Sequence, residues 1–166
     1  MTTTQRTLLL IDDDALARRC LVRTLGCPEY LILQAENGDR ALEILSHTHV
    51  DLVICDQHMG DSLGSDVLET IRARHPDVVR LMMTSDQSRE ALVRAINDGN
   101  VRRLLYKPWD DDQLKALVRQ CLGLPRVRPA AGAPPKIVQR RPSSMMRIAA
   151  ILGVGTGGTP ENRGGA

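Results

Sequence analysis

Aromatic side chains are almost absent from this sequence. Its 166 residues include no phenylalanine, one tryptophan and two tyrosines. Apolar residues nevertheless make up 42% of the chain, which is ordinary for a globular protein. A hydrophobic core must therefore be built from leucine, valine, isoleucine, alanine and methionine.

Long apolar runs are also missing. No stretch approaches the roughly 18–20 residues that a membrane-spanning helix needs. The N-terminal segment MTTTQRTLLLIDDD reaches three aspartates after too short an apolar stretch for a signal peptide. We therefore expect a cytoplasmic protein with no membrane partner.

The cysteines lack the spacing of a metal site or a redox motif. None of the four forms a Cys-x-x-Cys pair, and no histidine lies at zinc-ligand spacing from any of them. They are Cys20, Cys27, Cys55 and Cys121. Each has apolar neighbours, so we expect buried free thiols in a reducing compartment.

Charge is distributed unevenly along the chain. Residues 1–123 carry 15 Lys and Arg against 19 Asp and Glu, whereas residues 124–166 carry 7 against 1. The acidic body argues against direct nucleic-acid binding. The segment after Gly123 is also rich in Pro and Gly. We therefore expect a domain at 1–123 and a flexible basic tail at 124–166.

The first 123 residues alternate between short apolar runs and segments of helical period. The runs, which predict buried strands, are Thr7–Ile11, Leu31–Ala35, Leu52–Cys55, Val78–Met83 and Arg102–Tyr106. The helical segments centre on residues 17–25, 41–45, 67–71, 92–96 and 114–122. Asp110 with Gln113 predicts the start of the last helix, and Gly26, Gly99 and Gly123 predict helix ends. This alternation predicts a doubly wound α/β fold around a five-stranded parallel sheet.

Polar residues follow four of the predicted strands. Asp12 and Asp13 follow the first strand, and Asp56 follows the third. Thr84 follows the fourth and Lys107 the fifth. Parallel topology brings the carboxyl ends of strands to one edge of the sheet, where α/β proteins bind ligands.

Carboxylates crowded at such an edge need a cation. Oxygen ligands favour Mg²⁺ or Mn²⁺, and the backbone carbonyl of His58 is placed to help hold the ion. Phosphoryl transfer needs an in-line nucleophile and positive charge around the phosphoryl oxygens. Asp56 could supply the nucleophile, Lys107 a charge and the Thr84 hydroxyl a hydrogen bond.

The motifs LLLIDDD, DLVICDQHM, LMMTS and LLYKPWD resemble the receiver domains of bacterial two-component response regulators. The resemblance covers about residues 6–122. It implies a flavodoxin-like (βα)5 fold and a phospho-acceptor at Asp56. It further implies Mg²⁺ held at Asp12 and Asp13, and a phosphoryl group read by Thr84 and Lys107. The KPWD ending is similar to receivers that precede HD-type output modules.

Two positions depart from the usual receiver pattern. Gly60 stands where receivers usually carry proline, so we expect a looser loop after Asp56. Leu104 stands where they usually carry an aromatic residue, three positions before the lysine. Tyr106 falls on the same face as Leu104 by strand alternation, and could partly substitute for that ring.

The resemblance implies a signalling protein that is not an enzyme in the usual sense. Its expected partners are a sensor histidine kinase or phosphotransfer protein and an unidentified output protein. A homodimer through the fourth helix, fifth strand and fifth helix stays open. So does the alternative of a phosphorylation-independent adaptor. A phosphatase with an aspartate nucleophile would typically carry a second aspartate where this chain has His58.

Overall fold

The computed structural model describes residues 5–85 and 101–125. The helix predicted around residues 92–96 and the predicted tail beyond residue 125 lie outside this part of the chain. Among the residues that are described, no helix is long and apolar enough to cross a membrane.

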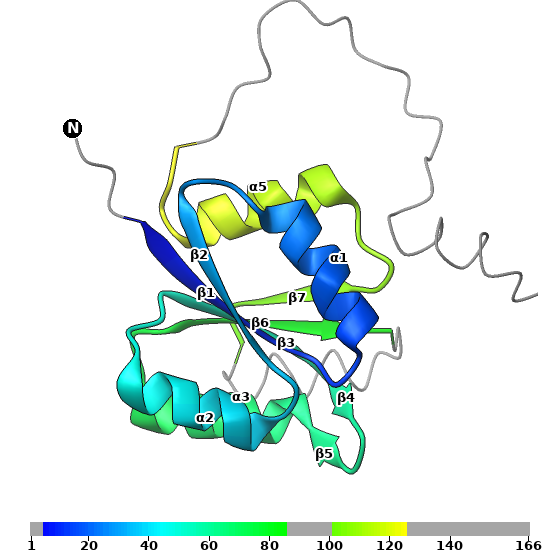
Figure 1. Cartoon of the computed structure of the whole chain (residues 1–166), viewed down its shortest axis with the longest axis vertical. Coiled ribbons are helices and arrows are strands. Elements are labelled where there is room, and N and C mark those ends of the chain that lie inside the picture. The colour runs from blue at the N-terminus through cyan, green and yellow to red at the C-terminus, as the bar shows by residue number, and fades with distance from the viewer. Residues whose placement is uncertain (1–4, 86–100, 126–166) are drawn as a thin grey trace, which may run out of the picture.

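Five parallel strands form the central sheet, as predicted (Figure 1). They are β1 (Arg6–Ile11), β2 (Tyr30–Ala35), β3 (Leu52–Asp56), β6 (Val79–Thr84) and β7 (Arg103–Tyr106). Their order is β2-β1-β3-β6-β7. The chain runs outward from β1 to β2, then crosses to β3 and continues in the other direction. The direction of the chain across the sheet thus reverses between β1 and β3. Doubly wound sheets bind ligands at the carboxyl ends of the strands next to such a reversal.

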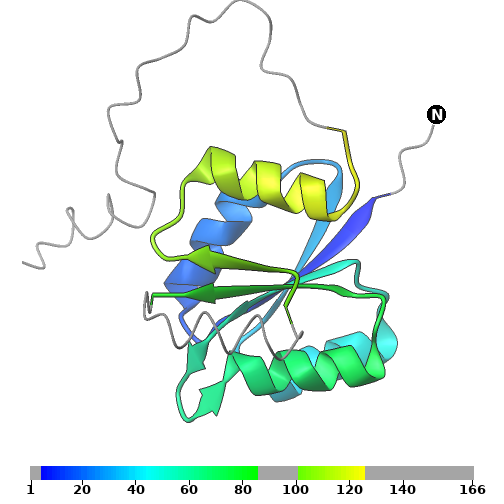
Figure 2. The ribbon, with the colours of Figure 1, turned by 180° about the vertical axis from the view of Figure 1, so that it is seen from behind.

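Helices cover both faces of the sheet. One layer holds α1 (Ala15–Leu25) and α5 (Asp111–Cys121), and the other holds α2 (Gly38–His47) and α3 (Gly64–Arg74), as Figures 1 and 2 show. Successive residues of β1 point to opposite layers: Leu8 and Leu10 pack with α1 and α5, and Leu9 and Ile11 pack with α2 and α3. Since both faces are buried, the strand needs apolar residues at every position.

The core is built without phenylalanine, as its composition requires. Its largest fully buried side chains are leucines, isoleucines and a methionine, and Trp109 is 2% exposed. The four thiols are free. Cys20 and Cys55 are buried as predicted, but the prediction was wrong for Cys27 and Cys121, which are half-buried because they lie at the rim of the α1–α5 layer.

The last helix begins and ends as its sequence predicts. Asp110 accepts a hydrogen bond from the Gln113 backbone N–H at 2.9 Å. At the other end Gly123 has φ of 66°, its N–H donates to Gln120, and Leu124 N–H donates to Arg119. This is the Schellman pattern, in which the left-handed residue is usually glycine. Gly26 differs: its φ is −57°, and a side chain there would lie 2.8 Å from the Val22 carbonyl oxygen.

A two-stranded hairpin after β3 was not predicted. It pairs β4 (His58–Met59) with β5 (Ser62–Leu63) in antiparallel register. Gly60 opens the two-residue turn with φ of 56°. Both common hairpin turn types need positive φ at this position, and proline, fixed near −65°, cannot adopt it. A proline could therefore not adopt the backbone conformation of Gly60, and whether the loop is looser stays a prediction.

Candidate acidic site at the carboxyl edge of the sheet

Four strands deliver the predicted site residues to one edge of the sheet. Asp12 follows β1, Asp56 and Thr84 end β3 and β6, and Lys107 follows β7. Asp12, Asp56 and Thr84 are buried, at 1%, 7% and 1% exposure. The polar ends of buried strands thus form a small enclosed cluster.

Lys107 bridges the two buried carboxylates. Its Nζ lies 2.9 Å from Asp12 Oδ2 and 2.9 Å from Asp56 Oδ1. Its backbone N–H donates to the Thr84 carbonyl at 2.8 Å, which continues the β6–β7 pairing to this point. Burial alone would lower the pKa of Lys107, but the bonds to Asp12 and Asp56 outweigh it and raise the pKa above its usual value. The lysine is therefore held in its charged form.

At Asp12, in contrast, the effect of burial on the pKa is larger than the effect of the bonds. Burial raises its pKa above the usual aspartate value, although Lys107 and the Asp14 backbone N–H favour the charged form. The Asp14 N–H donates to Asp12 Oδ1 at 2.9 Å, and Asp14 itself caps α1 through the Leu16 N–H at 2.8 Å. Of the three consecutive aspartates, Asp12 and Asp13 thus belong to the site, whereas Asp14 caps the helix.

A divalent cation fits the donor set at this edge. Asp12, Asp13 and Asp56 each offer one carboxylate oxygen, and these oxygens lie within 4.8 Å of one another. Asp13 is exposed and can turn towards an ion, whereas the other two are fixed by burial and by Lys107. Hard oxygen ligands with room for water suit Mg²⁺. The role predicted for the His58 carbonyl stays a prediction.

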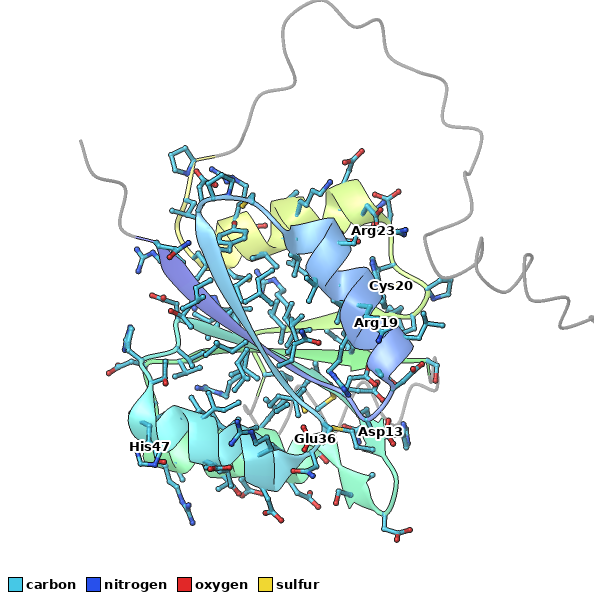
Figure 3. The ribbon with its side chains drawn as sticks, in the orientation of Figure 1. Asp13, Arg19, Cys20, Arg23, Glu36 and His47 are labelled. Atoms are coloured by element: carbon cyan, nitrogen blue, oxygen red, sulfur yellow. The ribbon has the colours of Figure 1, made fainter. Side chains whose placement is uncertain are left out.

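Three further residues at this edge were not predicted. Arg18 on α1 donates from Nη1 to the Asp12 carbonyl, which fixes the loop before the helix. Glu36, the first residue after β2, lies near Asp13 in Figure 3, consistent with the pairing of Ile11 with Ala35. Gly64, the first residue of α3, packs so closely on β3 that an added Cβ would lie 2.0 Å from the Asp56 carbonyl oxygen.

The roles of Arg18, Glu36 and Gly64 could hardly be predicted from the sequence. A charged residue on a helix or after a strand is common, and a glycine at a helix start has many causes. Only the rule that parallel strand ends meet could have included Glu36, since it follows a predicted strand.

The position of the missing aromatic residue is also defined. Leu104 is half-buried and packs against the core on the α2–α3 side, while Tyr106 is 37% exposed at the end of β7. Whether Tyr106 substitutes for a ring at 104 stays a prediction.

Comparisons with known proteins agree with this geometry. The family described as "Response regulator receiver domain" matches residues 8–119. The hydrogenase transcriptional regulatory protein HoxA of Cupriavidus necator is 30% identical over 122 residues, which cover 74% of this chain and 25% of that protein. The transcriptional regulatory protein ZraR of Escherichia coli is 34% identical over 115 residues, covering 69% and 26%. The chain thus spans about a quarter of the length of these relatives.

A solved structure is also similar. The signal receiver domain of an HD domain-containing protein from Pseudomonas fluorescens superposes with a TM-score of 0.68 at 32% identity. The match covers 72% of this chain and 95% of that structure. The likeness of the KPWD ending to receivers of HD-type proteins is consistent with this match.

Proposed function

Because this chain belongs to the response regulator receiver domain family, we propose that it accepts a phosphoryl group on Asp56 in a two-component phosphorelay. The observation that carries the proposal is the ion pair of Lys107 with both Asp12 and Asp56. These two aspartates, together with Asp13, also form the group of three carboxylates that could hold a metal ion. A nucleophile, a fixed positive charge and a set of metal ligands then share one enclosed edge.

The proposed chemistry follows from what phosphoryl transfer requires. A carboxylate oxygen of Asp56 attacks phosphorus, a new P–O bond forms, and the bond from phosphorus to the donor breaks in line with it. The donor leaves with the electron pair of that bond and takes a proton from solvent. Mg²⁺ bound at Asp12, Asp13, Asp56 and the His58 carbonyl would supply positive charge to the phosphoryl oxygens.

The remaining site residues bind the product. The Lys107 ammonium lies 2.9 Å from Asp56, so a small movement brings it to a phosphoryl oxygen. The Thr84 hydroxyl would donate a charge-assisted hydrogen bond to another. The burial of Asp12, Asp56 and Thr84 lowers the local dielectric constant, which would strengthen both interactions.

The proposed partners follow from the family. Receiver domains are signalling modules, so we propose a sensor histidine kinase or phosphotransfer protein as phosphoryl donor and an output that works through protein contacts rather than catalysis. We propose a cytoplasmic location. A homodimer involving β7 and α5 is also proposed, although the fourth helix of that face lies outside the described residues.

The direct test is phosphorylation by a small donor. Incubation with acetyl phosphate and Mg²⁺ should add one phosphoryl group by intact mass, and both chelation of the metal and Asp56→Asn should abolish it. Asp66→Asn, which changes an exposed acid on α3, is the matched control and should label like the parent. Undiminished labelling of Asp56→Asn would refute the assignment of the acceptor. A parent chain that is never labelled would favour the phosphorylation-independent adaptor.

A further inference from the structure

Helix α3 lacks a cap of its own. Its N-cap residue is Leu63, which has no side-chain hydrogen bond to the helix. The Gln57 side chain supplies this bond from outside, because Gln57 Oε1 accepts from the Ser65 backbone N–H at 3.1 Å. A free N–H at a helix start is usually satisfied by the N-cap residue itself. Here the residue immediately after Asp56 does it.

Gln57 is also fixed through its backbone. Its N–H donates to the Met83 carbonyl at 2.8 Å, and its carbonyl accepts from the Gly64 N–H at 2.9 Å. One residue is therefore tied to β6, immediately before Thr84, and twice to the first turn of α3. The close packing of Gly64 on the Asp56 carbonyl leaves no space for this turn to approach further.

We infer that Gln57 is a positioning residue for the metal site, holding Asp56 and the His58 carbonyl in ligand geometry by fastening the peptide between them to α3. The inference rests on the proposed function. The two proposed ligands, Asp56 and the His58 carbonyl, are the residues immediately before and after Gln57. If the fastening is lost, the loop samples more conformations, and only a fraction of them present both ligands together. The apparent affinity for the ion falls by that fraction.

The effect on catalysis should be distinct from that of a catalytic residue. Gln57 touches neither the phosphoryl group nor the ion in this scheme. Once Mg²⁺ is saturating, the ligands are assembled and phosphorylation should proceed as in the parent. The expected signature is a weaker metal affinity with a nearly unchanged rate at saturating metal.

The test is a Mg²⁺ titration of Gln57→Met in the full chain. Methionine keeps the length of the side chain but removes the carbonyl acceptor. The only tryptophan, Trp109, is buried two residues after Lys107 and provides a fluorescence signal, with calorimetry as a second readout. We expect the Kd for Mg²⁺ to rise about fivefold. The rate with acetyl phosphate at saturating Mg²⁺ should stay within about twofold of the parent.

The chain offers a matched control. Asn37 caps α2, on the same layer, through the Arg40 N–H at 2.8 Å. Asn37→Ala removes a helix cap without touching the residues around Asp56, so its melting temperature should fall while its Mg²⁺ affinity stays that of the parent. Equal weakening by both variants would mean that the loss reflects general instability, and would overturn the inference.

The two levels of proposal fail differently. A parent that binds Mg²⁺ and is labelled on Asp56, with Gln57→Met binding Mg²⁺ equally well, overturns the positioning role alone. A parent that neither binds Mg²⁺ nor is labelled overturns the proposed function and this inference with it.

Discussion

Two carboxylates in this protein, the partly buried Asp51 and the buried Asp12, have pKa values shifted in opposite directions. At the amino edge of the sheet, Asp51 accepts from Arg6 Nη1 and from the Thr7 N–H, both at 2.8 Å. Burial alone would raise the pKa of Asp51, but these two bonds hold it below the usual value. At the carboxyl edge, burial raises the pKa of Asp12. The charged form of Asp51 is thus favoured by its two bonds, whereas burial disfavours the charged form of Asp12 despite its bonds to Lys107 and the Asp14 N–H.

Asp51 should therefore support the fold in a pH-dependent way. Its pKa is lower in the folded than in the unfolded state, so its ionised form adds stability above the unfolded pKa, and this contribution is lost as pH falls through the folded pKa. Asp51→Asn should cost about 1–2 kcal/mol at pH 7. The difference from the parent should shrink below about pH 4. Urea unfolding of the parent and of Asp51→Asn at pH 7 and below about pH 4 measures this difference in the free energy of unfolding. A difference that is the same at both pH values would contradict the proposed pH dependence.

Thr84 should matter for reading the phosphoryl group rather than for receiving it. Thr84→Ala keeps the acceptor, the lysine and the metal ligands, so labelling of Asp56 should remain. The response of β7 and α5 to a beryllofluoride mimic should fall to about half or less, because a ligand shifts a switch only through differential contacts. NMR shifts of residues 101–120 measure this response. A response as large as in the parent would show that the coupling uses another route.

Glycines at the ends of the helices and strands are subject to two different constraints. Gly60 and Gly123 have positive φ and open space around them, so backbone conformation alone selects glycine. Gly64 faces the Asp56 carbonyl, so space selects it. The first kind belongs to a turn or helix end, and the second belongs to the contact between α3 and β3.

Alanine substitutions should distinguish these constraints. Gly60→Ala and Gly123→Ala should each cost about 1–2 kcal/mol, the cost of a left-handed conformation for a residue with a Cβ. Gly64→Ala should cost about 3 kcal/mol or more, because a backbone atom rather than a flexible side chain must move. Thermal unfolding of the three variants gives the order. Equal losses at all three positions would show that α3 shifts freely away from β3.

The described domain closes at its last helix. The Schellman pattern at Gly123 uses the Leu124 N–H, and Arg119 Nε donates to the Pro125 carbonyl at 3.0 Å. Thr24 Oγ1 on α1 also lies 2.9 Å from Asp111 Oδ1 on α5, which joins the two helices of this layer. These contacts join the end of the described domain to α1 and α5.

A chain shortened to residues 1–125 should therefore keep its fold. The segment beyond has few apolar residues at any regular spacing and little means to offset its ordering entropy. We expect its melting temperature to stay within about 3 °C of the full chain, less than the shift that 1 kcal/mol produces in a domain of this size. Differential scanning calorimetry measures it. A larger loss would show that the predicted tail packs on the domain.

The sequence alone was sufficient to predict the fold and the meeting of Asp12, Asp56 and Lys107 at one edge of the sheet. Apolar runs of strand length, separated by segments of helical period, predict parallel strands. Parallel strands must bring Asp12, Asp56 and Lys107 to one edge, whatever the details of packing. The helix caps at Asp110 and Gly123 could also be predicted from the sequence, because each involves hydrogen bonds between residues that are close together in the chain.

Only the tertiary structure decided how these residues contact one another. The bridge from Lys107 to two carboxylates, the cap that Gln57 gives to α3 and the space that requires Gly64 each depend on atoms from separate elements meeting within a few ångströms. The hairpin at Gly60 was missed because two-residue strands are too short to show a period. Periodicity specifies which face of an element is buried, but close approach between elements depends on the packing of the whole domain.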